Sequence, residues 1–147
     1  PKPFELSTFV EDLLLSDEDV SNLIIDRQDI VLKNTEIKEN SSKVIRIGTV
    51  GKGGQGERIY SPKGIAITLS AHGGGVFAKT GGYLINGKTR KLHPRECARI
   101  MGYPDSYLIH PSSSQAYKQF GNSVVVNVLQ YISKNMGEAL NHGYSYI

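Results

Sequence analysis

The stretch GTVGKGGQGERIYSPKGIAITLSAHGGGVFAKTGGYLING, residues 48–87, decides the fold of this 147-residue chain, because it holds twelve of the 16 glycines. β-Branched and aromatic residues interleave with these glycines, so the stretch does not have the composition of a flexible linker. The pattern predicts short strands joined by glycine-rich loops, in which the backbone can turn sharply and approach a ligand closely. We expect strands at residues 44–50, 57–60, 66–70, 82–85 and 89–92. The dipeptide Asn86-Gly87 predicts a hairpin turn between the last two.

Weaker helical patterns precede this stretch. Residues 8–15 and 20–25 each predict a short helix. We expect Ser16 or Asp17 to cap the second helix, because acidic residues follow in its first turn. Residues 29–33 predict a short strand.

Helices are also predicted after the stretch, at residues 94–101 and 115–120, followed by a longer helix of about four turns that begins near Ser123. Asn122 and Ser123 are the candidate N-caps of the long helix. Its apolar residues share one face and comprise Val124, Val125, Val128, Leu129, Ile132 and Met136. The sequence therefore predicts an α+β fold with a small, twisted, mostly β part followed by helices.

Composition excludes several classes of protein. Apolar residues make up 39% and charged residues 21% of the chain, which is typical of a globular domain and not of a disordered one. No run approaches the ~18 apolar residues of a membrane span. The single cysteine excludes an internal disulfide and fits a reducing, cytoplasmic setting. Because the chain begins with Pro1 and not Met, we expect it to be cut from a longer protein.

The charge is divided unevenly along the chain. Residues 1–42 carry 4 Lys/Arg and 10 Asp/Glu, for a net charge of −6, whereas residues 43–147 carry 13 and 4, for +9. Such an asymmetry indicates that the second part binds a polyanion. A basic, solvated surface without a partner is the alternative.

Two glycine-rich loops carry side chains suited to nucleic acid. Lys52, Gln55 and Arg58 project from the first loop, and arginine can donate two parallel hydrogen bonds to guanine. The second loop, residues 70–80, has the same character. Lys88, Arg90 and Lys91 suit phosphate contacts. The alternatives are a solvated hairpin loop and a plain strand edge.

No enzyme site is evident from the residues alone. The string GKGGQG, residues 51–56, matches G-x-G-x-x-G, but a strand and not a helix is predicted to follow, which argues against dinucleotide binding. Cys97 lies in an apolar helical pattern, so we expect it to be buried and structural. The four histidines lack metal-ligand spacing, and no nucleophile is found with a base beside it.

Two strings resemble motifs of a known family. RKLHPRECARIMGYPD, residues 90–105, is similar to the penultimate motif of the bacterial DNA (cytosine-5)-methyltransferases, and QFGNSV, residues 119–124, is similar to their last motif. Both strings are specific, and the resemblance, which is closest to HhaI-like members, extends over essentially the whole chain. The family's Phe-x-Gly-x-Gly and Glu-Asn-Val motifs are absent. Its Pro-Cys motif is absent too, since Glu96 precedes Cys97.

The resemblance therefore implies the C-terminal half of such an enzyme. Residues 1–11 would connect from a missing catalytic domain, residues 12–93 would form the target-recognition domain, and residues 94–147 would return to the catalytic domain. It implies double-stranded DNA as the partner, S-adenosyl-L-methionine as the cofactor, and a bacterial, cytoplasmic restriction–modification enzyme with a GCGC-type site. The chain alone has no catalytic residues and is expected to transfer no methyl group.

The resemblance also implies roles for individual residues. Gln55 would enter the space left by a flipped base, and Arg58 would recognise guanine. His72 replaces an expected tyrosine, which puts the identity of the site in doubt. The implied DNA-binding residues are Lys52, Gln55, Arg58, Thr68, Ser70, Gly75, Lys79 and Lys91, and the implied cofactor-binding residues are Asn122 and Ser123. A DNA-binding module without enzyme activity and a separate subunit of a split enzyme are the alternatives.

Overall fold

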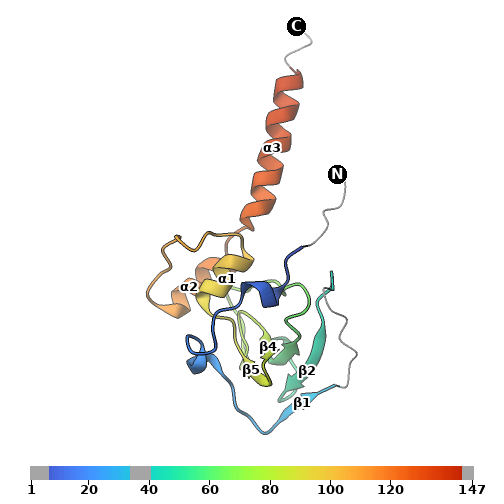
Figure 1. Cartoon of the computed structure of the whole chain (residues 1–147), viewed down its shortest axis with the longest axis vertical. Coiled ribbons are helices and arrows are strands. Elements are labelled where there is room, and N and C mark those ends of the chain that lie inside the picture. Colours follow the sequence, from blue (N-terminus) through green and yellow to red (C-terminus); the bar gives the residue numbers. More distant parts are fainter. Residues whose placement is uncertain (1–6, 34–40, 144–147) are drawn as a thin grey trace.

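A five-stranded sheet lies at one end of the molecule in the computed structural model, which describes residues 7–33 and 41–143 (Figure 1). Its strands follow the chain order and are β1 (Ile30–Leu32), β2 (Arg46–Val50), β3 (Arg58–Tyr60), β4 (Gly82–Ile85) and β5 (Lys88–Arg90). All neighbours pair antiparallel except β3 and β4, which are parallel. The predicted hairpin between β4 and β5 is confirmed, because Asn86 and Gly87 have φ values of 50° and 74°.

The strand predicted at residues 66–70 is wrong. This segment lies in the connection between the parallel strands β3 and β4 and joins no ladder. Its backbone bonds go elsewhere: the Ile67 N–H donates to the Tyr83 hydroxyl at 3.2 Å, and the Ser70 N–H donates to the Lys79 carbonyl at 2.9 Å. A side chain and a loop therefore take the place of a neighbouring strand.

The two early helices form only single 3₁₀ turns, η1 (Val10–Leu13) and η2 (Ser21–Leu23). The predicted cap at Ser16 or Asp17 is wrong, because the N-cap position of η2 is Val20 and the Ser16 hydroxyl donates to Asp19 instead. Tertiary bonds connect both turns to the sheet region: the Val10 N–H donates to the Gly64 carbonyl, and the Leu23 carbonyl accepts from the Lys91 N–H.

Three α-helices follow the sheet, as predicted: α1 (Pro94–Ile100), α2 (Ser113–Gly121) and α3 (Val126–Gly143). The predicted start of α3 is wrong. Asn122 is the C-cap of α2, and the Ser123 hydroxyl donates to the Phe120 carbonyl at 2.9 Å. Both residues therefore end α2, and α3 begins only at Val126.

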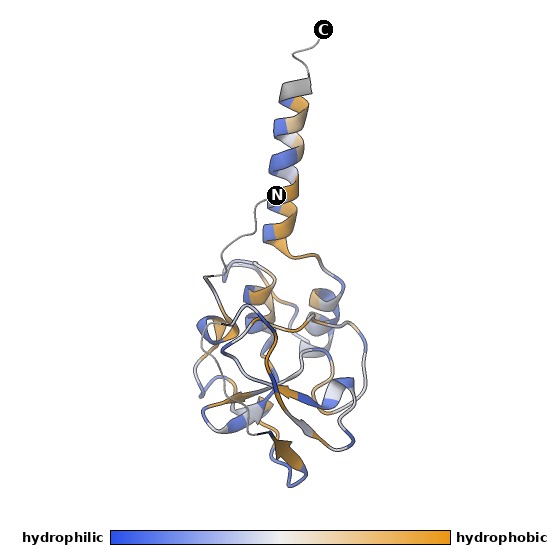
Figure 2. Ribbon diagram, turned by 90° about the vertical axis from the view of Figure 1, so that its right-hand side faces the viewer, coloured by the Kyte–Doolittle hydropathy of each residue, from blue (hydrophilic) through white to orange (hydrophobic). Residues whose placement is uncertain are grey.

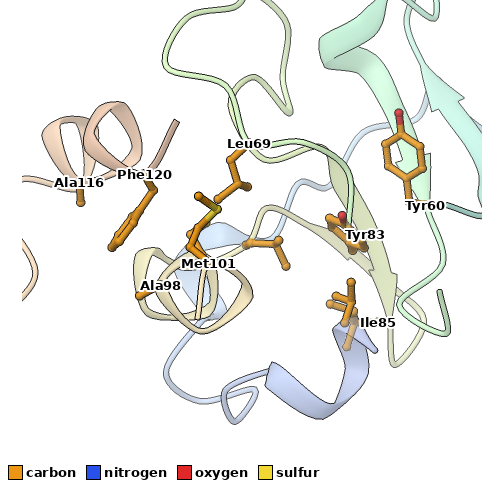
Figure 3. Close-up of a cluster of buried hydrophobic side chains, with 11 residues drawn as sticks. Tyr60, Leu69, Tyr83, Ile85, Ala98, Met101, Ala116 and Phe120 are labelled. Carbon is orange, nitrogen blue, oxygen red and sulfur yellow. The ribbon is translucent and has the colours of Figure 1, made fainter. Parts of the chain in front are cut away.

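The larger hydrophobic core joins the sheet to α1 and α2 (Figure 3). It contains Val10, Tyr60, Leu69, Tyr83, Ile85, Leu92, Cys97, Ala98, Met101, Ala116 and Phe120. A smaller cluster, Ile47, Val50, Ile59 and Phe77, packs within the other part of the sheet. The mixture of a small sheet and C-terminal helices is thus confirmed, while the division at residues 93 and 94 and the assignment of the helices to a catalytic domain stay predictions.

Helix α3 projects away from the rest of the molecule (Figure 1). Its first turn is tied down, because the Val126 N–H donates to the Met101 carbonyl at 2.9 Å. Hydrophobic residues recur along one side of the helix (Figure 2). The apolar residues of this region that are exposed by about half or more are Val124, Val128, Leu129, Ile132, Met136 and Leu140. None of the helices in residues 7–33 and 41–143 has the length and apolar character of a membrane span.

Candidate nucleic-acid interface

The two glycine-rich loops pack against each other through their backbones. The Phe77 N–H of the second loop donates to the Gly56 carbonyl of the first at 2.8 Å. Gly75 has φ +100°, and a Cβ placed on it would lie only 2.6 Å from that same carbonyl oxygen. Only glycine tolerates both this backbone conformation and this approach. The glycines that the sequence concentrates here therefore join the two loops into one surface.

A cleft of about 170 Å³ lies between these loops. Four of the predicted DNA-binding residues line it, namely Gln55, Thr68, Ser70 and Lys79, and His72 lines it too. These residues come from three separate parts of the chain, and the sequence alone did not show that they meet. The cleft therefore collects amide, hydroxyl and ammonium groups at the junction of the loops.

The motif at residues 119–124 packs against the backbone of the second loop. Gly121, at the end of α2, lies against the backbone of Ser70 and Ala71 so closely that a Cβ there would overlap with it. The Ser70 hydroxyl donates to the His72 carbonyl within the loop. Thr68 also borders a second cleft of about 420 Å³, which Ser123 lines as well. One predicted DNA-binding residue, Thr68, and one predicted cofactor-binding residue, Ser123, thus line the same cleft.

Lys79 and Lys91 form a positive region beside the cleft. Lys79 has φ 80°, unusual for a residue with a side chain, and its Nζ lies 3.3 Å from the Ser114 hydroxyl and 6.0 Å from the ring centre of Tyr117. Lys91 is half-buried, and its pKa is lowered, first by burial and then by the charge of Lys79. Two neighbouring ammonium groups of this kind suit an anion such as a phosphate.

The remaining predicted DNA-binding residues lie outside the lining of the cleft. Lys52 is exposed at the first loop, and Arg58 lies on β3 opposite Thr49, partly buried. The Arg58 Nε–H group is buried and donates no hydrogen bond to any of the described residues. Gly75 acts through its backbone approach and not as a lining residue.

The prediction that Arg90 contacts phosphate is wrong. Its guanidinium is 2% exposed and pairs with the fully buried Glu96 carboxylate at 2.7 and 2.8 Å. Glu96 also accepts from the Leu15 and His93 N–H groups. The capping-box position of Glu96, two residues after Pro94 at the start of α1, was the available sequence signal. This pair fixes the packing of β5 and α1 and does not face a ligand.

Arg99 is another residue with a structural role, and sequence reasoning did not single it out. It makes a bidentate pair with Asp105, at 2.7 and 2.8 Å, and it also donates to the carbonyls of Leu13 and Leu14. The pairing with Arg99 lowers the pKa of Asp105. Arg99 therefore holds the segment that contains Leu13 and Leu14 against α1.

Cys97 is confirmed as a buried residue. Burial raises the pKa of its thiol far above the ordinary value, so the thiolate needed of a nucleophile is disfavoured. Within residues 7–33 and 41–143, no group of three His, Cys, Asp or Glu side chains is placed to hold a metal ion.

Asn122 and Ser123 offer part of a polar site. Asn122 is exposed directly after α2, with its backbone N–H already donated back to α2 carbonyls. One exposed amide and one hydroxyl fit the edge of a pocket for a polar small molecule. They do not enclose such a molecule by themselves.

Comparison with known proteins gives a consistent result. The C-5 cytosine-specific DNA methylase family profile matches residues 2–138. The type II methyltransferase M.HhaI of Haemophilus parahaemolyticus is 74% identical over 141 residues, which cover 96% of this chain and 43% of that protein. M.DsaV of Dactylococcopsis salina is 36% identical over 140 residues, covering 92% of this chain and 36% of that protein. The chain thus spans less than half the length of these curated relatives.

The fold is also similar to a solved structure. The crystal structure of the S. pombe Dnmt2 methyltransferase superposes with a TM-score of 0.62 at 17% sequence identity, covering 91% of this chain and 41% of that one. At this identity the likeness concerns the arrangement of the sheet and helices alone.

Proposed function

Because this chain belongs to the C-5 cytosine-specific DNA methylase family, we propose that it recognises a specific sequence in double-stranded DNA as part of a restriction–modification methyltransferase. The relatives are type II methyltransferases. The Pro-Cys motif of the family is absent from the sequence, so the chain alone has no nucleophile for the reaction. Methyl transfer therefore requires a second, catalytic part, which we propose as the partner of this chain in the bacterial cytoplasm.

The junction of the two loops carries this proposal. Gly56 and Gly75 bring an amide, two hydroxyls and an ammonium group to one cleft, and nearby lysines supply positive charge. Amides, hydroxyls and arginine are the groups that form hydrogen bonds with base edges, whereas lysines attract phosphates. The glycine backbone lets these groups approach a groove of the duplex.

The proposed DNA-binding residues divide into three kinds. Gln55 lies in the cleft and would occupy the space of a flipped cytosine, while Arg58 would donate to a guanine. Thr68, Ser70 and Gly75 would shape the surface against the DNA. The proposed phosphate contacts are Lys52, Lys79 and Lys91. We propose GCGC as the target because of the likeness to M.HhaI. At position 72 this chain has histidine where we expect tyrosine, so the contact that this side chain makes with DNA would differ.

S-adenosyl-L-methionine is the proposed cofactor, and it supplies the methyl group. Asn122 would offer its exposed amide and Ser123 its hydroxyl to the polar part of this cofactor. Both follow α2, whose last residue packs on the second loop. The cofactor edge and the DNA surface are therefore held by the same element.

The apolar face of α3 is the proposed contact with the catalytic part. Five of its residues within α3, Val128, Leu129, Ile132, Met136 and Leu140, are exposed by 47–63%. An apolar face of this length is typical of a surface that another protein part covers. The relatives are more than twice as long as this chain, so a complete enzyme of this kind would contain such a part.

A panel of duplexes at fixed salt tests this function. In the complete methyltransferase, Arg58→Ala should weaken binding of the GCGC duplex by roughly 1–3 kcal/mol and relax the preference at one base pair. Lys91→Ala is the matched control for a phosphate contact: it should weaken all duplexes alike and reduce the salt slope by about one. Equal binding of every duplex by the unaltered protein would overturn the proposed function.

A further inference from the structure

The loop that carries Lys52 and Gln55 is held by a carboxylate from a distant part of the sequence. The Gly51 N–H donates to Asp29 Oδ2 at 3.1 Å, although the two residues are 22 positions apart. Gly51 has φ +58°, so the chain turns sharply at this point. This bond therefore fixes where the loop departs from β2.

Arg27 holds the Asp29 carboxylate in place. Its guanidinium makes a bidentate contact with Asp29, with Nε–Oδ1 and Nη2–Oδ2 distances of 2.7 and 2.6 Å. Bidentate pairs of this kind restrict the orientation of the carboxylate as well as its position. The pKa of Asp29 is accordingly lowered, chiefly by the hydrogen bond from Arg27, so the carboxylate is charged at neutral pH.

Glu57 fixes the other end of the same loop. Its Oε2 atom accepts from the Gly54 N–H at 2.8 Å, and its own N–H donates to the Gly54 carbonyl at 3.0 Å. A Cβ on Gly51 would lie 2.9 Å from Glu57 Oε1 and 3.8 Å from Asp29 Oδ2, so both carboxylates converge on this residue. Gln55 therefore follows the two anchored glycines, Gly51 and Gly54, and precedes Glu57 in the chain.

Two carboxylates bonded to a loop that is proposed to bind DNA are otherwise unfavourable, because like charges repel phosphates, and the Asp29 side chain is 44% exposed. The Arg27 side chain offsets one of them directly. Both carboxylates accept from backbone N–H groups, a role that an apolar or a basic side chain would not fill. The acidic first part of the chain thus has a specific contact with the basic second part.

We propose that Asp29, oriented by Arg27, is a positioning residue that sets the conformation of the 51–57 loop and thereby the discrimination between DNA sequences. The proposal rests on the proposed function only for its DNA readout. Asp29 contacts the Gly51 backbone and would not itself contact a base. The carbonyl oxygen of an asparagine could replace it as the acceptor, whereas alanine could not.

Three variants of the full chain test the proposal: Asp29→Ala, Asp29→Asn and Asp26→Ala. Asp26 is exposed and lies three positions from Asp29, so its variant matches the change of charge. Amide hydrogen exchange at Gly51 should be about tenfold faster in Asp29→Ala than in the unaltered chain. It should change by less than about threefold in Asp29→Asn and Asp26→Ala.

Binding of a GCGC duplex and of a duplex changed at one base pair gives the second readout. Asp29→Ala should lower the ratio of the affinity for the GCGC duplex to that for the changed duplex by about three- to tenfold. Asp29→Asn should largely keep the ratio of the unaltered chain. Unchanged exchange at Gly51 in Asp29→Ala, or unchanged discrimination with faster exchange, would overturn the positioning role. If the unaltered chain does not discriminate at all, the proposed function fails, and the exchange data still decide whether Asp29 anchors the loop.

Discussion

The Tyr83 hydroxyl lies outside the cleft between the two loops, yet it helps to position the segment that carries Thr68, a residue of the cleft lining. Tyr83 is fully buried, and its hydroxyl accepts from the Ile67 N–H at 3.2 Å. Ile67 immediately precedes Thr68, which lines the cleft. The extended segment therefore depends on one side-chain oxygen where a neighbouring strand would otherwise supply the acceptor.

Tyr83→Phe should lower the free energy of unfolding by about 1–3 kcal/mol, because the Ile67 N–H loses its acceptor in the interior. Urea unfolding at pH 7 measures this loss. Tyr107→Phe is the matched control, since Tyr107 is 43% exposed and the same atom is removed. Equal stability of the two variants would contradict the role of the Tyr83 hydroxyl.

Alkaline pH gives a second, independent residue-scale prediction. Burial raises the pKa of Tyr83 from 10.0 to about 12, so the neutral hydroxyl is favoured in the folded state. This contribution to stability is fully present below pH 10 and is lost as the pH rises toward 12. Between pH 10 and 12, Tyr83→Phe should therefore lose less stability than the unaltered chain in urea titrations. A steeper loss in the variant would contradict this assignment.

At the scale of elements, local signals predicted the hairpin and the helices after the sheet well. Asn86-Gly87 fixes a turn through its own backbone preferences, and Pro94 suits the first turn of α1. The error at residues 66–70 has a nonlocal cause, since an alternating apolar pattern does not reveal that Tyr83 supplies the acceptor. Arg90 was misjudged for a related reason: the capping-box position marks Glu96 for a role at the start of α1, but its ion pair with Arg90 forms only through the packing of β5 against α1.

The candidate site was predictable in its residue types but not in its assembly. The glycines, lysines and Gln55 marked two loops, and the family resemblance marked Thr68 and Ser70. No sequence pattern indicated that Gly56 and Gly75 meet, because that contact joins backbones.

Gly75→Ala should destabilise the element formed by the two loops. The substitution combines a φ of +100° with a Cβ only 2.6 Å from the Gly56 carbonyl oxygen, and backbone strain of this kind costs roughly 1–3 kcal/mol. Gly74→Ala is the matched control, because a Cβ there meets nothing within 4 Å. Thermal unfolding and duplex discrimination should both decline for Gly75→Ala alone. Equal behaviour of the two variants would contradict the loop contact.

At the scale of the whole molecule, the sheet, α1 and α2 share one core, and α3 extends away from it (Figure 1). The sequence predicted the amphipathic character of α3 correctly but placed its start three residues early, at Ser123 and not Val126. Its apolar residues Val128, Leu129, Ile132, Met136 and Leu140 remain exposed by 47–63%.

The chain alone should self-associate through α3. Pairing two such faces would bury several Val, Leu, Ile and Met side chains, each worth roughly 1.5–3 kcal/mol. Light scattering during size-exclusion chromatography should show a mass that rises with concentration. Ile132→Glu should keep the chain monomeric, whereas Gln130→Glu, with the same added charge on an exposed polar residue, should not. A strict monomer at high concentration would contradict this prediction.

Amide NMR of the chain, titrated with a GCGC duplex and with a scrambled duplex of equal length, tests most directly whether the two loops form one DNA-binding surface. We predict that the GCGC duplex shifts the amide signals of residues 51–57 and 68–80 together, and that the scrambled duplex shifts them less. Signals that stay unchanged in both loops while other parts of the chain respond, or identical shifts with both duplexes, would contradict the account.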